Sequence, residues 1–121
     1  MDGKLFTEAL MDKLKALTTI YFEKADSGVV LPYAVIQSIT FSGNVTYEVA
    51  TIEIAVYQKD GATLSVETIS KAIKDGLHGT QLRVSGQFSS HIYFETSDNL
   101  RDPDSDIISR RMTFTARIFY I

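Results

Sequence analysis

The last stretch of the chain, residues 105–121, constrains the fold most because it alternates almost without interruption between apolar and polar residues. One face would carry Ile108, Met112, Phe114, Ala116, Ile118 and Tyr120, and the other would carry Ser109, Arg111, Thr113, Thr115 and Arg117. A period of two is typical of a strand with one buried face and one face open to solvent or to a partner. Arg110 is the single break on the apolar side. We therefore predict a C-terminal strand that closes the hydrophobic core.

The energy at stake in this strand is large for a small domain. Burying one large apolar side chain contributes roughly 1.5–3 kcal/mol, so five or six of them contribute on the order of 10 kcal/mol. The net stability of such a domain is only about 5–15 kcal/mol. Deleting the strand is therefore expected to unfold the monomer.

Two segments show helical periodicity. The first, residues 4–17, places Leu5, Phe6, Ala9, Leu10, Leu14 and Leu17 at spacings of three and four. The second repeats Val66, Ile69, Ala72, Ile73 and Leu77 at similar spacings. Thr63 and Ser65 are among its candidate caps, and Gly76 or Gly79 is its expected stop. Both patterns predict amphipathic helices that cover a core.

Three further strands are predicted between and after the helices. Leu31-Pro32 fixes an extended entry to a strand over residues 33–41, and a second strand follows over residues 46–58. The second strand is apolar on both faces, which favours a central position in the sheet. A third strand is expected over residues 82–95, with a bulge or bend at Gly86, and residues 18–30 and 96–106 are expected to be irregular.

The expected order is therefore helix, strand, strand, helix, strand, strand. We predict a single α+β domain over residues 1–121, with a four-stranded, mostly antiparallel sheet and both helices on one face, in the order α-β-β-α-β-β. An antiparallel sheet covered on one side satisfies every apolar stripe at once. Its open face would keep the threonines, arginines and tyrosines.

Bulk composition excludes several classes of function. The net charge of −3 at pH 7 gives no basic footprint for tight binding of nucleic acid or anionic lipid. The sequence contains no cysteine, which excludes disulfides and thiolate metal sites. No segment has the ~20 apolar residues of a membrane span, so we expect a soluble protein made in the cytoplasm.

Catalytic and cofactor motifs are sparse. The only histidines are His78 and His91, no serine lies in a G-x-S-x-G motif, and glycine-rich phosphate-binding loops are absent. Carboxylates at Asp102, Asp104 and Asp106 could chelate a hard cation, but the glycine and distal glutamate of an EF-hand loop are missing. We interpret this cluster as a solvated turn and predict no enzymatic activity, no cofactor and no metal.

The polar face of the last strand is the best candidate for an interaction surface. Arg111 and Arg117 share it, and arginine and tyrosine are enriched at the cores of protein interfaces. The alternative is a solvated sheet face whose charges prevent aggregation. The candidate interface residues are Tyr47, Tyr57, Arg101, Asp102, Asp104, Asp106, Arg111 and Arg117.

Several segments, taken in order, resemble a known family. They are Leu31-Pro32-Tyr33-Ala34-Val35, residues 50–57 with the helix that follows, Asp102-Pro103-Asp104, and residues 108–114. Together they are similar to the small tail completion or tail terminator proteins of long-tailed bacteriophages and prophages, which lie at the head–tail junction. The resemblance covers nearly the whole chain except residues 18–30.

The resemblance implies a structural function. Subunits of this kind form a homo-oligomeric ring, commonly hexameric, that caps the tail tube protein and joins it to the head connector protein. The resemblance further implies that DNA passes through the ring without sequence-specific binding and that no membrane takes part. The protein would then be assembled in the bacterial host cytoplasm and become part of the tail or neck of the virion. The alternatives are a small ligand-binding or enzymatic α+β domain of unknown substrate, or another connector or baseplate subunit.

Overall fold

The computed structural model describes residues 3–22, 32–43, 47–59, 63–101 and 107–120. Within these residues, two helices and six strands follow one another. They are α1 (Gly3–Lys15), β1 (Ile20–Phe22), β2 (Tyr33–Gly43), β3 (Glu48–Lys59), α2 (Thr63–Leu77), β4 (Thr80–Val84), β5 (Phe88–Arg101) and β6 (Ile107–Tyr120). Within the described residues, neither helix is long and apolar enough to cross a membrane.

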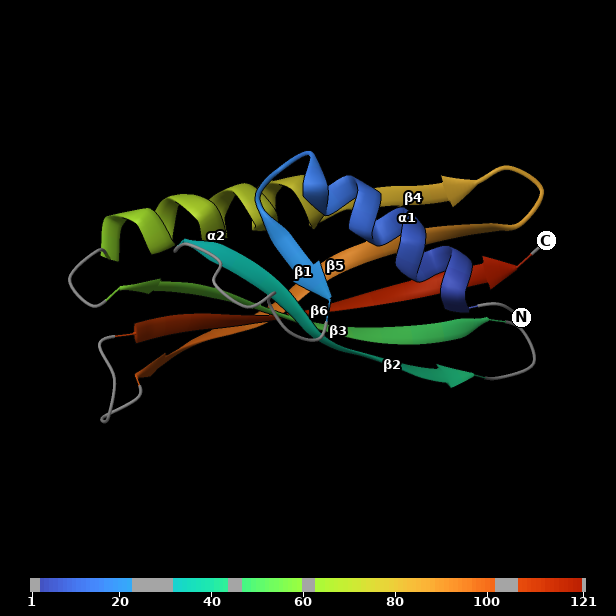
Figure 1. Ribbon diagram of the computed structural model, residues 1–121. Helices are drawn as coiled ribbons and strands as arrows, with labels where there is room; N and C mark the ends of the chain where they lie inside the picture. The colour runs from blue at the N-terminus through green and yellow to red at the C-terminus, as the bar shows by residue number, and fades with distance from the viewer. Residues whose placement is uncertain (1–2, 23–31, 44–46, 60–62, 102–106, 121) are drawn as a thin grey trace.

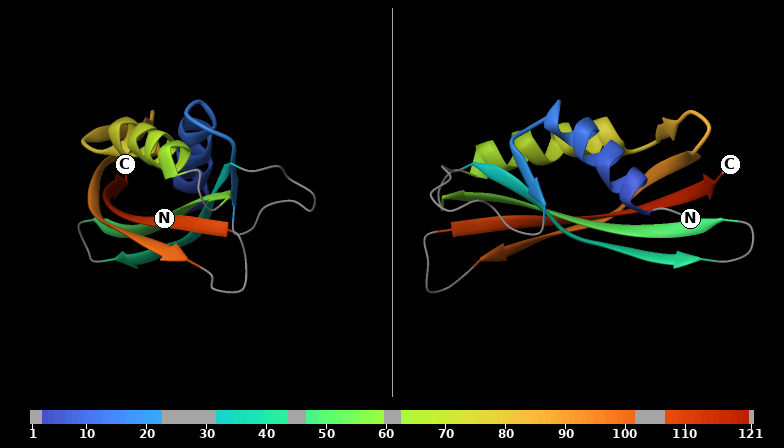
Figure 2. Two further views of the ribbon diagram at one scale, coloured as in Figure 1. Left: turned by 90° about the vertical axis from the view of Figure 1, so that its left-hand side faces the viewer. Right: turned by 45° about the vertical axis from the view of Figure 1, so that its right-hand side comes forward.

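All six strands belong to one sheet, in the order β1-β2-β3-β6-β5-β4. Every neighbouring pair is antiparallel except β1 and β2, which are parallel. Both helices lie on the same face, and the sheet curls so that β4 reaches the level of the helices (Figure 1). The view along the sheet shows the opposite face without a helix over it (Figure 2).

The prediction for the C-terminal strand is confirmed. β6 lies in the middle of the sheet between β3 and β5, with Phe114 opposite Ile52 on one side and Phe94 on the other. The side chains of Met112, Phe114, Ala116 and Ile118 are at most 1% exposed. The central position predicted for residues 46–58 is also confirmed, because β3 pairs with β2 and β6 along its length.

The helices complete the core from one side. Phe6, Leu10 and Leu14 of α1 are fully buried, as are Ile73 and Leu77 of α2. The prediction that Ala72 belongs to the core-facing stripe is wrong, because Ala72 is exposed and Ser70 is buried instead. Gly76 continues α2 against Leu17, whereas Gly79 follows the helix with a φ of 74°. Only the second of the two candidate stops therefore ends the helix.

The predicted four-stranded sheet in the order α-β-β-α-β-β is wrong, because the sheet has six strands. One additional strand is β1, within the stretch that we expected to be irregular. It pairs with β2, and the pairing begins with Ile20 opposite Ala34. The Ala34 amide donates a hydrogen bond to the Thr19 carbonyl at 2.9 Å. Three residues are too few to display a period.

The other additional strand arises because the expected strand over residues 82–95 is a hairpin. Gly86 has a φ of 75°, and the Gln87 amide donates to the Val84 carbonyl at 3.0 Å, which closes a tight turn between β4 and β5. After the turn, β5 continues to Arg101, so the loop predicted over residues 96–106 is wrong for its first six residues. A register shift between Phe94 and Thr96 interrupts the alternation that would have identified this extension.

Candidate functional site

The sheet face opposite the helices, called here the outer face, carries the polar residues of the central strands. Its middle is a band of threonines. The register places Thr40 opposite Thr51, Thr51 opposite Thr115, and Thr113 opposite Thr96. This band also contains Tyr93, opposite Thr115, and Glu53, opposite Thr113, and it separates two clusters of arginine and aromatic residues.

The first cluster, called the Arg117 cluster, consists of Tyr47, Arg117 and Phe119. The Arg117 guanidinium lies 5.6 Å from the centre of the Tyr47 ring, a distance at which a cation is attracted to an aromatic face. The Tyr47 and Phe119 rings are 5.6 Å apart. Arg117 is exposed and Phe119 is 40% exposed. This cluster therefore presents aromatic surface and a cation to solvent.

The second cluster, called the Arg111 cluster, begins with an ion pair across β5 and β6. The Arg111 Nη2 donates to Asp98 Oδ2 at 3.0 Å. This hydrogen bond, the charge of Asp98 and the nearby charge of Glu53 raise the pKa of Arg111 above its ordinary value, so that it stays protonated. Arg111 lies opposite Ala55 on β3, and Tyr57 lies two residues further along that strand, opposite Ser109.

Tyrosines extend the Arg111 cluster toward β1. The Tyr33 and Tyr57 rings are 5.4 Å apart, and the Tyr21 and Tyr33 rings are 5.9 Å apart. The Gln37 amide donates to the Tyr57 hydroxyl at 2.8 Å, which fixes this tyrosine at the outer face.

The predicted interface residues divide between the two clusters and the end of the sheet. Tyr47 and Arg117 come together in the Arg117 cluster, and Tyr57 and Arg111 lie in the other. Arg101 is the last residue of β5, opposite Ile108. Asp102, Asp104 and Asp106 lie outside the described residues, as does the rest of the loop that was considered for a cation.

Sequence reasoning missed four members of these clusters, and one of them, Tyr21, lies in the stretch 18–30 that we expected to be irregular. Asp98 was assigned to a loop, although an acid placed to face Arg111 could have indicated strand pairing. Phe119 continues the alternation 111, 113, 115, 117 and could have been found from it. Tyr33 was predicted as a member of the strand over residues 33–41 and not as part of an interface.

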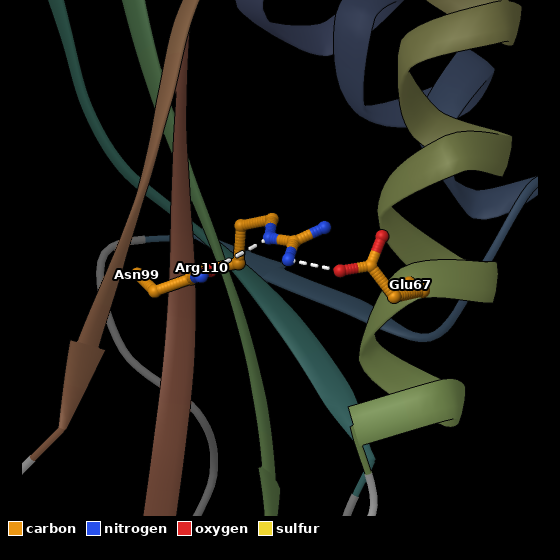
Figure 3. A network of polar contacts seen from close by, with 3 residues as sticks. All are labelled: Glu67, Asn99 and Arg110. Atoms are coloured by element: carbon orange, nitrogen blue, oxygen red, sulfur yellow. Dashed lines mark hydrogen bonds and ion pairs between the residues drawn. The ribbon is translucent and has the colours of Figure 1, made fainter.

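The inner side of β6 carries a polar network at Arg110, the residue that interrupts the apolar alternation. Its Nε donates to Asn99 Oδ1 at 2.8 Å, and its Nη2 pairs with Glu67 of α2 (Figure 3). The hydrogen bond from Arg110 lowers the pKa of Glu67 below its ordinary value, and the same bond raises the pKa of Arg110. This network ties α2 to the end of the sheet where β5 and β6 meet.

The two histidines differ in position: His91 lies on β5 directly opposite Arg117, beside the Arg117 cluster, and His78 follows α2. His78 Nδ1 accepts a hydrogen bond from the Phe94 amide at 3.0 Å, and His91 is exposed on β5. Among the residues that the structure describes, no three histidine or acidic side chains are grouped so that they could hold a metal ion.

Comparison with solved structures shows that this fold occurs in another protein. The chain superposes with a TM-score of 0.76 on a chain from the virion of a native gene transfer agent particle. The alignment covers 93% of this chain and 92% of that chain at 18% sequence identity, so the two share the fold. No curated protein matches the sequence.

The family is shown by the sequence itself. The family model of tail completion protein gp17 matches residues 7–119, and the chain therefore belongs to that family. It is a structural protein of bacteriophage tails, as the resemblance in the sequence predicted.

Proposed function

We propose that copies of this protein form a closed ring that caps the finished tail tube and joins it to the head connector. DNA passes through the ring without sequence-specific contact, and the protein acts without catalysis or a cofactor. The ring assembles in the host cytoplasm and becomes part of the neck of the virion. Membership of the tail completion family supports this role.

The observation that carries the proposal is the presence of two different clusters on the outer face. A ring needs a head-to-tail interface, in which one patch of a subunit meets a different patch of its neighbour. Arg111 and Arg117 are six positions apart on β6, which at about 3.3 Å per residue separates the two clusters by roughly 20 Å. One cluster can therefore engage a neighbour while the other engages the neighbour on the opposite side.

The chemistry of the clusters fits such contacts. Tyrosine and arginine supply much of the binding energy of interfaces because they offer large contact areas with few rotatable bonds or with rigid donors. The net charge of −3 fits a channel that lets DNA slide, because strong phosphate binding requires an excess of basic residues.

The test is whether charge reversal in the Arg117 cluster prevents assembly without affecting the fold. Purified protein is added to tails that lack it, and joining to heads is scored by infectivity. Sedimentation velocity measures the oligomeric state of the free protein. Arg117→Glu is expected to reduce joining at least tenfold with a melting temperature close to wild type. The matched control is Lys13→Glu, which makes the same charge change on the exposed side of α1.

Two results would contradict the proposal. One is wild-type protein that fails to restore joining to tails that lack it. The other is Arg117→Glu protein that restores joining as well as the Lys13→Glu control does.

A further inference from the structure

The edge of β5 that points away from β6 is only partly paired. β4 covers it from Phe88 to Ile92, and the next amide on this edge, that of Phe94, donates to His78 Nδ1. In the described part of the chain, no strand pairs with this edge from Thr96 to Arg101. An unpaired edge presents a row of backbone donors and acceptors to which another extended chain can bind.

The register shows which backbone groups point outward along this edge. The Phe94 amide points to His78 and hence away from β6. The register shift at Glu95 then places Thr96 opposite Thr113, and Ser97 opposite Met112. In an antiparallel ladder, residues whose backbone groups bond to the neighbouring strand alternate with residues whose backbone groups point away from it. After the register shift, Ser97 and Asn99 are of the second kind, so their backbone groups point away from β6.

A pocket of about 390 Å³ lies between α2 and this part of the sheet. Phe94 and Met112 give it an apolar floor, and Ser70 and Lys74 line it from α2. Ser97 also lines the pocket, so the free strand edge and the pocket are adjacent. A volume above about 300 Å³ is within the range of pockets that hold a ligand group.

Two polar features of the pocket match a ligand that carries a carboxylate. Ser70 is 4% exposed, and its hydroxyl has no hydrogen-bond partner among the described residues. Both acids in the lining already have partners, since Glu67 pairs with Arg110 and Asp75 pairs with Lys71 at 2.6 Å. The remaining cation, Lys74, lies 4.5 Å from the centre of the Phe94 ring. The pocket therefore combines an apolar floor, an excess positive charge and an unused hydroxyl.

We propose that this groove binds an extended segment of a partner protein, which adds as a strand to the free edge of β5. One apolar side chain of the segment enters the pocket over Phe94 and Met112, and a neighbouring carboxylate reaches Lys74 and the Ser70 hydroxyl. The outward backbone groups of Ser97 and Asn99 hold the main chain. This site is on the edge and helix side of the sheet, so it is separate from the outer face.

The experiment selects binders from a yeast-displayed library of random heptapeptides on the wild-type protein, and measures their affinity for four variants. Ser97→Pro removes the outward amide, and an edge strand tolerates proline because no ladder hydrogen bond is lost. Its control is Ser97→Ala, which keeps the amide. Lys74→Glu reverses the charge in the pocket, and Lys15→Glu makes the same change on the exposed side of α1.

We expect enriched peptides that share an apolar residue close to an aspartate or glutamate. Their affinity should fall at least tenfold with Ser97→Pro and with Lys74→Glu, and stay within twofold with the two controls. If Ser97→Pro does not fold, as judged by its melting curve, the comparison of Lys74→Glu with Lys15→Glu decides.

Three results would overturn the proposal. The first is a selection that enriches no peptide. The second is a set of peptides that the Lys74→Glu variant binds as tightly as the Lys15→Glu variant does. The third is self-association of the wild-type protein that Ser97→Pro or Lys74→Glu abolishes, which would assign the groove to a second copy of the chain.

Discussion

Replacing Phe114 with alanine is expected to remove a large part of the stability of the fold. Phe114 is fully buried at the centre of β6, and its ring makes an edge-on contact with Phe94 at 5.5 Å between centres. Truncating a buried phenylalanine costs about 3–5 kcal/mol, from the lost burial and the cavity left behind. The aromatic contact is worth about 0.5–1.5 kcal/mol beyond burial, which favours the upper half of that range. This is a substantial share of a net stability of about 5–15 kcal/mol.

The effect can be measured by thermal unfolding followed by circular dichroism and by urea titration. A domain of 121 residues loses roughly 3–6 °C of melting temperature per kcal/mol, so a decrease of about 10–30 °C is expected. Phe119→Ala is the matched control, because Phe119 is on the same strand but faces the outer side and is 40% exposed. Its truncation is expected to cost about 1 kcal/mol or less. Equal losses for the two variants would refute the assignment of the faces of β6.

Two further predictions concern the β4–β5 turn and the ion pair that joins α2 to the sheet. Gly86→Ala is expected to cost about 1–2 kcal/mol in urea unfolding, because Gly86 has a φ of 75° that residues with a Cβ adopt only under strain. The neighbouring Ser85→Ala is the control, and an equal cost for both would contradict this reason. Because the folded-state pKa of Glu67 lies below its ordinary value of 4.5, its pairing with Arg110 stabilises the fold above that pH and is lost as the pH falls through the folded-state pKa. The difference in melting temperature between wild type and Glu67→Gln should therefore shrink below pH 4.5, and a difference that stays constant with pH would contradict this.

Elements with a long, regular period could be predicted from the sequence. Met112, Phe114, Ala116 and Ile118 alternate over a whole strand, so both its existence and its buried face follow from the pattern. The core stripe of α1, with Phe6, Leu10 and Leu14, follows in the same way. In each case the side-chain period itself reports which face is buried.

The elements that were missed depend on pairing rather than on their own composition. Asp98 and Asn99 look like loop residues, but Arg111 and Arg110 on the adjacent strand give both of them partners. The extra residue at Glu95 shifts the period in the middle of β5, and the tight turn at Gly86 divides one apparent strand into two. Such features are set by the register between strands, which a single sequence does not display.

The candidate site could be predicted only as residue types on one face. The alternation placed Arg111 and Arg117 on the outer face, and both lie there. Their division into two clusters depends on Asp98, Tyr33 and Phe119, whose neighbours come from different strands. The pocket beside β5 depends on how α2 crosses the sheet, which the helical period of α2 does not determine.

The central claim, that the outer face is where subunits meet, is tested most directly by labelling single cysteines in assembled particles. The chain has no cysteine of its own, so Thr115→Cys on the outer face and Lys13→Cys on α1 each introduce one site. Maleimide labelling of Thr115→Cys is expected to be at least tenfold slower in joined tails than in the free protein, while labelling of Lys13→Cys changes less than twofold. Equal labelling of Thr115→Cys in the free and joined states would contradict the claim.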